Sequence, residues 1–159
     1  MHRQSPHRAR HGVTLIELLV VIGILLLLYS IMVSALRTTN ASAALDTETL
    51  KVSMELKESR SLTLSSKNAN QFGVHLASSS VTIFEGALFV AGSATNTVML
   101  LNPQTQISSI ALSGGGSDVV FERLTGKTST GGTIRISLTA DPSKTKTITV
   151  YPTGVTEIQ

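Results

Sequence analysis

The chain has 159 residues, enough for one ordinary domain with an appendage, and contains 13 Lys and Arg, 10 Asp and Glu, and no cysteine. The absence of cysteine excludes disulfides, thiolate metal sites and thiol nucleophiles. Because Arg3, Arg8 and Arg10 account for the formal charge of +3, the rest of the chain is formally neutral and is not typical of a nucleic-acid-binding domain.

The first element predicted after this basic leader is a membrane-spanning helix. No charged residue occurs from Leu18 to Leu36, a run of 19 positions. As a helix the run covers about 28 Å, close to the hydrocarbon thickness of a bilayer. Since basic residues precede it and only Arg37 follows closely, the positive-inside rule places the N-terminus in the cytoplasm and the remainder of the chain outside it.

Two ordinary explanations of the apolar run are open. A secretory signal peptide would be cleaved at Ala41-Ser42-Ala43, but Arg37 intervenes and the apolar core is longer than the roughly 7–15 residues usual in such a peptide. A plain single-span anchor explains the length but leaves Glu17 unexplained. An ionisable group in the centre of a membrane helix costs about 2.5–3.5 kcal/mol, so it usually has a partner.

A third interpretation rests on the stretch RHGVTLIELLVVIGILLLL, which resembles the prepilin signature of type IV pilins and type II secretion pseudopilins. Gly12 matches the last residue of the leader, Thr14 and Leu15 match the Thr-Leu pair, and Glu17 matches the glutamate at the fifth mature position. Val13 departs from the Phe or Met more often found in the family. The resemblance implies cleavage after Gly12 by prepilin peptidase and N-methylation of Val13.

This resemblance gives Glu17 a physical role. Cleavage after Gly12 would create a free amine on Val13, which the carboxylate of Glu17 on a neighbouring subunit could meet. Unpaired, each buried charge carries a desolvation cost of several kcal/mol, which pairing largely offsets. The pair would also fix the stagger between subunits, so Glu17, with Thr14 and Leu15, is expected to set the assembly register.

Beyond the membrane part, taken as 13–36, the helix is expected to continue, and the whole element is predicted over 13–66. The stretch LKVSMELK alternates like a strand, but Leu, Met, Glu and Lys favour a helix, and no Gly or Pro occurs between Gly23 and Gly73. The turn-forming KNANQFG cluster follows it.

At helical spacing this segment has two apolar faces. One is formed by Ala41, Leu45, Val52 and Leu56. The opposite face contains Leu50 and Met54. Such a helix packs either on its own domain and on neighbouring subunits, or on two sides within one domain.

After Phe72, Gly, Ser and Thr become frequent and short apolar stretches alternate with turn signals. The strands are too short and too close together for βαβ units, so 67–159 is predicted to be an antiparallel, β-sandwich-like domain and the fold class α+β. The stretch TITVYPTGVTEI is expected to form a hairpin. The candidate strands are 72–77, 80–86, 87–92, 97–102, 106–112, 118–123, 133–139, 146–152 and 155–159.

The C-terminal region adds a second resemblance. VVFERLTG, a Gly-rich break, TIRISL and KTITVYPTGVTEI resemble the minor pseudopilin H and minor pilin T group, whose members have a β-sandwich-like domain. This implies a leader (1–12), a helix and an extracytoplasmic β-rich domain (67–159) of a minor subunit placed near the tip of a type II secretion pseudopilus or type IV pilus. The implied partners are other pilin-like subunits through the N-terminal helix, prepilin peptidase and the inner-membrane assembly platform.

Residues for catalysis or metal binding are not apparent. His75 stands alone in an apolar strand, where a packed or solvated imidazole is expected, and Asp118 and Glu122 are interpreted as a solvated strand edge. SGGGS lacks the Lys of a phosphate-binding loop. Neither an enzyme nor a cofactor or metal site is therefore expected.

A DNA receptor for natural transformation is the alternative function. Arg135, Lys144 and Lys146 would be its basic residues, but Asp141 and Glu157 offset them and no aromatic stacking platform accompanies them. Nucleic-acid binding is thus expected to be the weaker interpretation.

Overall fold

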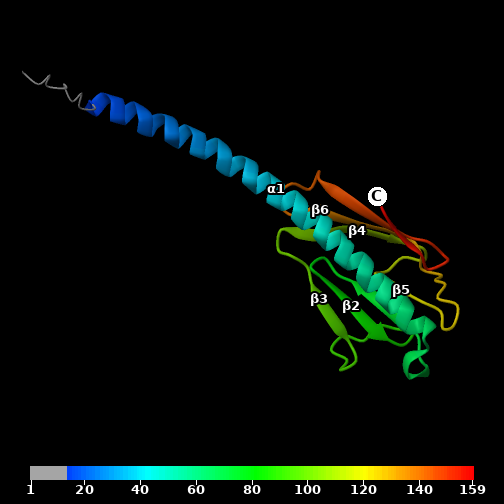
Figure 1. Cartoon of the computed structure of the whole chain (residues 1–159). Helices are drawn as coiled ribbons and strands as arrows, with labels where there is room; N and C mark the ends of the chain where they lie inside the picture. The colour runs from blue at the N-terminus through cyan, green and yellow to red at the C-terminus, as the bar shows by residue number, and fades with distance from the viewer. Residues whose placement is uncertain (1–13) are drawn as a thin grey trace, which may run out of the picture. The chain divides into compact units, whose positions relative to one another are not determined.

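The computed structural model describes residues 14–159, and for residues 33–39 it describes the helical backbone alone (Figure 1). The first described element is α1, Leu15–Leu64, and the chain divides into two compact units, Met1–Thr39 and Asn40–Gln159. Each unit is described by itself.

In the first unit, the described part of α1 beyond Glu17 has no charged side chain and is apolar on all sides. Leu15–Met32 has a mean hydropathy of 2.7 and none of it is buried against protein. A soluble helix normally buries one apolar stripe, whereas a helix that is apolar all round suits a membrane. By length and composition, this segment can cross a bilayer.

In the second unit, the 3₁₀ turn η1 (Lys67–Ala69) leads into eight strands that form two antiparallel sheets. One sheet has the order β3-β2-β1-β5 and the other β4-β6-β7-β8, so the chain enters the second sheet at β4, returns for β5 and then completes the second sheet. The strands are β1 Phe72–Leu76, β2 Ser80–Glu85, β3 Thr97–Leu100, β4 Thr105–Leu112, β5 Asp118–Val120, β6 Gly132–Leu138, β7 Thr145–Val150 and β8 Thr156–Ile158.

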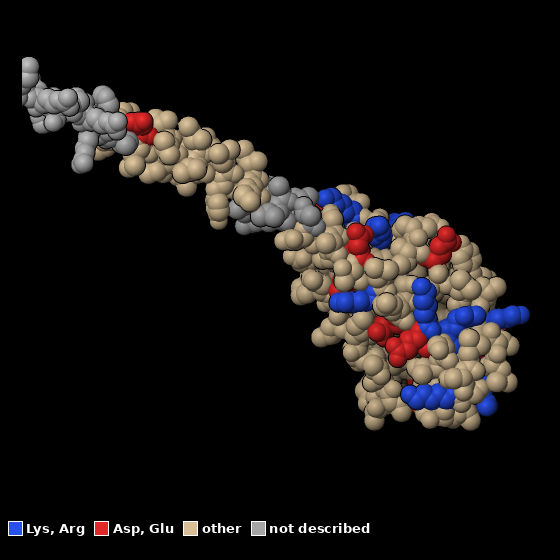
Figure 2. Space-filling view, viewed as in Figure 1, with Lys and Arg blue, Asp and Glu red and all other residues tan. Residues whose placement is uncertain are grey.

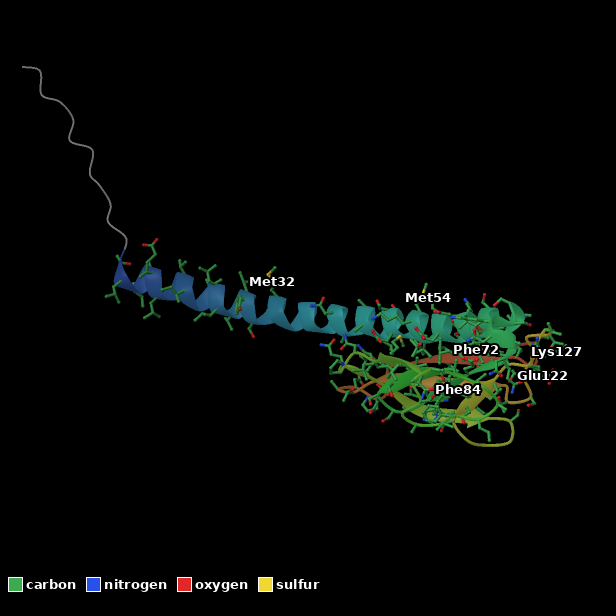
Figure 3. All side chains as sticks on the ribbon, turned by 90° about the horizontal axis from the view of Figure 1, so that it is seen from below. Met32, Met54, Phe72, Phe84, Glu122 and Lys127 are labelled. Carbon is green, nitrogen blue, oxygen red and sulfur yellow. The ribbon has the colours of Figure 1, made fainter. Side chains whose placement is uncertain are left out.

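The part of α1 in this unit lies along one side of the strands (Figure 3). Leu45, Val52 and Leu56 are buried and join side chains of both sheets in one hydrophobic core. On the opposite face, Leu50 is 54% and Met54 64% exposed. The structure therefore confirms the α+β class and the two faces of the helix, and it excludes burial of both faces within the domain.

The buried face of α1 also contains hydroxyl groups that the hydrophobic pattern does not indicate. The Thr49 hydroxyl donates to Leu45 O (2.7 Å), so burial leaves it satisfied. The Thr63 hydroxyl donates to Ser59 O (2.9 Å) and accepts the N–H of Phe72 at the start of β1 (2.9 Å). These bonds let Thr49 and Thr63 enter the interface without the cost of an unpaired group, whereas the buried hydroxyl of Ser59 has no partner among the described residues.

Eight of the nine candidate strands are present, but the prediction of a strand at 87–92 is wrong. This stretch belongs to a loop over the outer face of the first sheet, because the Phe89 ring stacks on His75 (centroids 3.9 Å apart) and meets Phe84 edge to face (5.6 Å). Gly86 and Gly92 adopt positive φ angles of 112° and 76°, which break an extended strand.

Two other local features depend on glycine. The β7–β8 hairpin forms as expected, closed by Tyr151 N–H donating to Val155 O (2.9 Å), and Gly154 takes the left-handed conformation (φ 77°) that this turn requires. In β1, the ring of Phe84 lies over Gly73, where an added Cβ would come within 2.4 Å of Phe84 Cζ. Only a glycine fits beneath that ring.

Candidate processing and assembly site

The predicted site residues lie at the start of α1. Gly12 and Val13 lie outside the described residues. Thr14, Leu15 and Glu17 are described, and all three side chains are exposed. The structure thus brings Thr14 and Glu17 together in one helical turn. The cleavage position after Gly12 is predicted from the sequence alone.

Thr14 is the N-cap of α1. Its hydroxyl oxygen accepts the backbone N–H of Glu17 (3.3 Å), and its carbonyl accepts the N–H of Leu18 (3.2 Å). The cap satisfies one of the four N–H groups that a helix start leaves without partners, an effect of about 1 kcal/mol. This role of Thr14 was not predicted, although Ser or Thr followed three residues later by Glu is a recognisable capping pattern.

Glu17 therefore has a local reason to occupy the first turn as well as its predicted role. Its carboxylate lies near the positive end of the helix dipole, which stabilises a negative charge. No cation forms an ion pair with Glu17 among the residues that the structure describes. Figure 2 shows a red, acidic group at the start of the otherwise tan described part of this helix, and Glu17 is the one acidic residue in the described part of the first unit. An exposed, unpaired carboxylate at the start of an apolar helix can accept a cation from outside the chain.

In the second unit, a further surface faces away from the strands along α1. Leu50 and Met54 are its apolar side chains, and Met54 points away from the sheets in Figure 3. Glu55 and Glu58 lie beside them. Partial burial, together with repulsion from Glu58, raises the pKa of Glu55 above its ordinary value. The surface thus combines two apolar side chains with two carboxylates that form no ion pair among the described residues, while the nearby Lys51 pairs with Glu48 (2.7 Å).

His75 does not stand alone, contrary to the expectation from sequence. His75 in β1 lies opposite Asp118 in β5, and Nδ1 is 2.6 Å from Asp118 Oδ1 while Phe89 covers the ring. Glu122 lies beyond the end of β5 at Val120, so Asp118 and Glu122 do not form the solvated strand edge. Strand pairing across 43 positions of the chain carries no signal in the sequence.

The three basic residues of the DNA-receptor alternative have different surroundings. Lys146 Nζ lies 3.1 Å from Asp46 Oδ1 on α1. Arg135 in β6 is exposed, and Lys144 lies near Asp141 in the turn before β7. Within residues 14–159, no group of three His, Asp or Glu residues is placed to hold a metal ion.

Comparison with known proteins identifies a motif in the N-terminal segment. Residues 7–33 match the family described as the prokaryotic N-terminal methylation motif. The match includes Gly12, Val13, Thr14, Leu15 and Glu17. No curated protein sequence and no solved structure matches the chain.

The motif is typical of type IV pilins and type II secretion pseudopilins. With the α+β architecture, the motif makes this chain similar to pilin-like proteins, and Leu15–Met32 is long and apolar enough to cross a membrane. Proteins of this class are generally structural rather than enzymatic.

Proposed function

We propose that this chain is a minor subunit of a type II secretion pseudopilus or type IV pilus. It is inserted with its N-terminus in the cytoplasm, cleaved after Gly12 by prepilin peptidase and methylated on Val13. The inner-membrane assembly platform then draws it into the filament near the tip, where minor subunits start assembly. The C-terminal resemblance to the pseudopilin H group supports the minor class.

One observation carries this proposal: at the capped start of an otherwise uncharged apolar helix, Glu17 is exposed and forms no ion pair with any residue that the structure describes. Cleavage after Gly12 would leave the Val13 amine four residues, about one helical turn, before Glu17. When the helix is surrounded by lipid or by other helices, both charges need a partner. An amine from an adjacent subunit would pair with Glu17 and fix the axial step between the two helices.

The exposed apolar face of α1 in the second unit supports the same role. Leu50 and Met54 remain exposed although the helix buries its other face. Exposed apolar side chains that line up along a helix are typical of surfaces that pack on another protein.

The test compares Glu17→Ala with Glu17→Gln. Both remove the charge, but glutamine retains the capping ability of glutamate. If pairing with an amine is required, both variants insert into the membrane and both lose incorporation into sheared filaments. If only the Glu17→Gln chain is incorporated normally, Glu17 acts by capping the helix and not by pairing with an amine. If both variants are incorporated normally, the proposal is excluded.

Mass analysis of the same material tests the processing step. The mature wild-type chain is expected to begin at Val13, with one added methyl group. Any other N-terminus contradicts cleavage after Gly12. Since the Glu17 variants keep Gly12 and Val13, they serve as controls that separate processing from assembly.

A further inference from the structure

A rigid, exposed loop lies at the end of the second unit where α1 terminates. We call residues 122–127 the Leu124 knob, since Leu124 projects from it and is 70% exposed. Leu124 has a φ angle of 68°, in the left-handed region that costs a non-glycine residue about 1–2 kcal/mol. A fold that retains an exposed leucine in such a conformation holds it there by other contacts.

Those contacts are hydrogen bonds on both sides of the knob. Glu122 N–H donates to Lys127 O (2.8 Å), and Gly126 N–H donates to Glu122 O (2.9 Å). From α1, Arg60 Nε donates to Gly126 O (3.0 Å). The knob is therefore preorganised, and binding would cost little additional ordering.

The knob carries positive charge beside Leu124. Arg123 and Lys127 are both exposed, and neither forms an ion pair with any residue that the structure describes. Arg123 Nε donates only to the hydroxyl of Ser66 (3.3 Å), and Glu122 accepts the hydroxyl of Thr125 (3.2 Å). A suitable partner would offer an apolar surface flanked by carboxylates.

The same chain presents such a surface on α1. The outer helix face includes Leu50, Met54, Glu55 and Glu58, of which Leu50, Met54 and Glu58 follow one another at intervals of four and so form a single ridge. Lys51 lies between the two glutamates around the helix, but its ammonium group pairs with Glu48 (2.7 Å). Neither glutamate has an ion-pair partner among the described residues, although Lys57 lies on the other side of the ridge. At Leu50 the ridge borders a shallow groove of about 320 Å³ that Thr49 and Ile158 also line.

We propose that the Leu124 knob of one copy docks on the outer helix face of a second copy, with Leu124 against Leu50 and Met54 and with Arg123 and Lys127 facing Glu55 and Glu58. The proposal rests on the proposed function, because a filament places subunits side by side. Opposite charge and exposed apolar side chains then meet in one contact.

The contact joins two different surfaces. Figure 3 shows Lys127 at the end of the unit and Met54 farther back along α1. A heterologous contact of this kind leaves one knob and one outer helix face free after each addition. It therefore adds copies in one direction.

Cysteine cross-linking of the full chain in membranes tests the contact without background, because the chain has no cysteine of its own. A chain with both Met54→Cys and Leu124→Cys should give a ladder of cross-linked species under mild oxidation. Each single variant alone should stay monomeric, and a mixture of the two should stop at the dimer. Replacing Leu124→Cys by Ala140→Cys, another exposed position, gives the matched control and should yield no ladder.

Charge exchange tests the direct pairing. Glu55→Lys with Glu58→Lys should reduce the cross-linked fraction roughly tenfold, and Arg123→Glu with Lys127→Glu should do the same, because like charges would then face one another. All four substitutions together should restore cross-linking. Thermal unfolding of each variant shows that the fold is retained.

Three outcomes overturn the proposal: no cross-link between Met54→Cys chains and Leu124→Cys chains, equal self-linking of either single variant, or failure of the fourfold exchange to restore the contact. Processing at Val13 and recovery in sheared filaments are measured in the same samples. If both remain normal while cross-linking fails, the knob contact is excluded and the proposed function stands. If cross-linking succeeds in chains that are neither cleaved nor in filaments, the proposed function fails instead.

Discussion

The two segments of α1, residues 15–32 and residues 40–64, have the same backbone conformation for different physical reasons. The first segment is apolar on every side and buries none of its surface in protein. The second has a buried face that includes Leu45, Val52 and Leu56 and an exposed face that includes Met54. The stability of the first helical segment depends on its solvent, whereas that of the second depends on the sheets that pack against its buried face.

This difference shows what an exposed apolar side chain means in each segment. In the first, exposure of leucine is the normal state of a helix in lipid. In the second, which has its own hydrophobic core, exposure of Leu50 and Met54 marks a surface available to another protein. The same residue types therefore suit a membrane in one segment and, in the proposed contact, recognition in the other.

The largest expected effect comes from the buried face of the second segment. Leu56→Ala removes a side chain that is 0% exposed, and we expect a loss of about 3–4 kcal/mol in the free energy of unfolding. Denaturant unfolding of a chain beginning at Asn40 measures it, since all core residues lie between Ala41 and Ile158. Met54→Ala is the control and should change stability by less than about 0.5 kcal/mol. Equal losses would remove the distinction between the two faces.

A slightly smaller effect separates the two exposed surfaces. Leu25→Lys places a charge near the middle of the first segment and should cost about 2.5–3.5 kcal/mol of insertion free energy. Met54→Lys places the same charge on the second segment and should leave insertion unchanged. Resistance of the full chain to alkaline extraction from membranes measures both. Extraction of the Met54→Lys chain would show that the second segment also enters lipid.

The sheet that covers the second segment offers the next test. Gly73→Ala puts a Cβ within 2.4 Å of Phe84 Cζ, and the displaced ring should cost about 1–3 kcal/mol of unfolding free energy. Combined with Phe84→Leu, the alanine should cost less than it does alone, because the obstacle is gone. Full additivity of the two losses would mean that the ring does not rest on Gly73.

The sequence predicts most of the architecture because its signals are local. Leu45, Val52 and Leu56 recur at helical spacing, and turn residues such as Gly154 separate the strands. The error at 87–92 has a nonlocal cause. The apolar run packs through Phe89 on His75 and Phe84 of other strands instead of pairing as a strand.

The candidate site is predictable only in part, for the same reason. Gly12, Thr14 and Glu17 form a contiguous motif, so the sequence indicates them together. The partnership of His75 with Asp118 depends on the pairing of β1 with β5, and the hydroxyls of Thr49 and Thr63 are buried because they bond to nearby backbone. Hydrophobic periodicity contains none of this information.

The smallest expected effect concerns charge beside the exposed face. Burial, and next the neighbouring Glu58, raises the pKa of Glu55, so the folded state holds this proton more tightly than the unfolded state. Stability attributable to Glu55 is therefore greatest in acid and is lost as the pH rises through the interval above the ordinary value of 4.5. Glu55→Gln should stabilise the domain at pH 7 by about 0.2–0.5 kcal/mol and by nothing near pH 3.

Thermal unfolding of the wild type and the variant across this pH range measures the difference. Glu58→Gln is the matched control. It removes the repulsion but not the burial of Glu55, so its gain at pH 7 should be the smaller of the two. If the two curves for wild type and Glu55→Gln run parallel from acid to neutral pH, the charge of Glu55 carries no cost in the free domain. The carboxylates of the outer helix face would then carry no repulsion that a cationic partner could relieve.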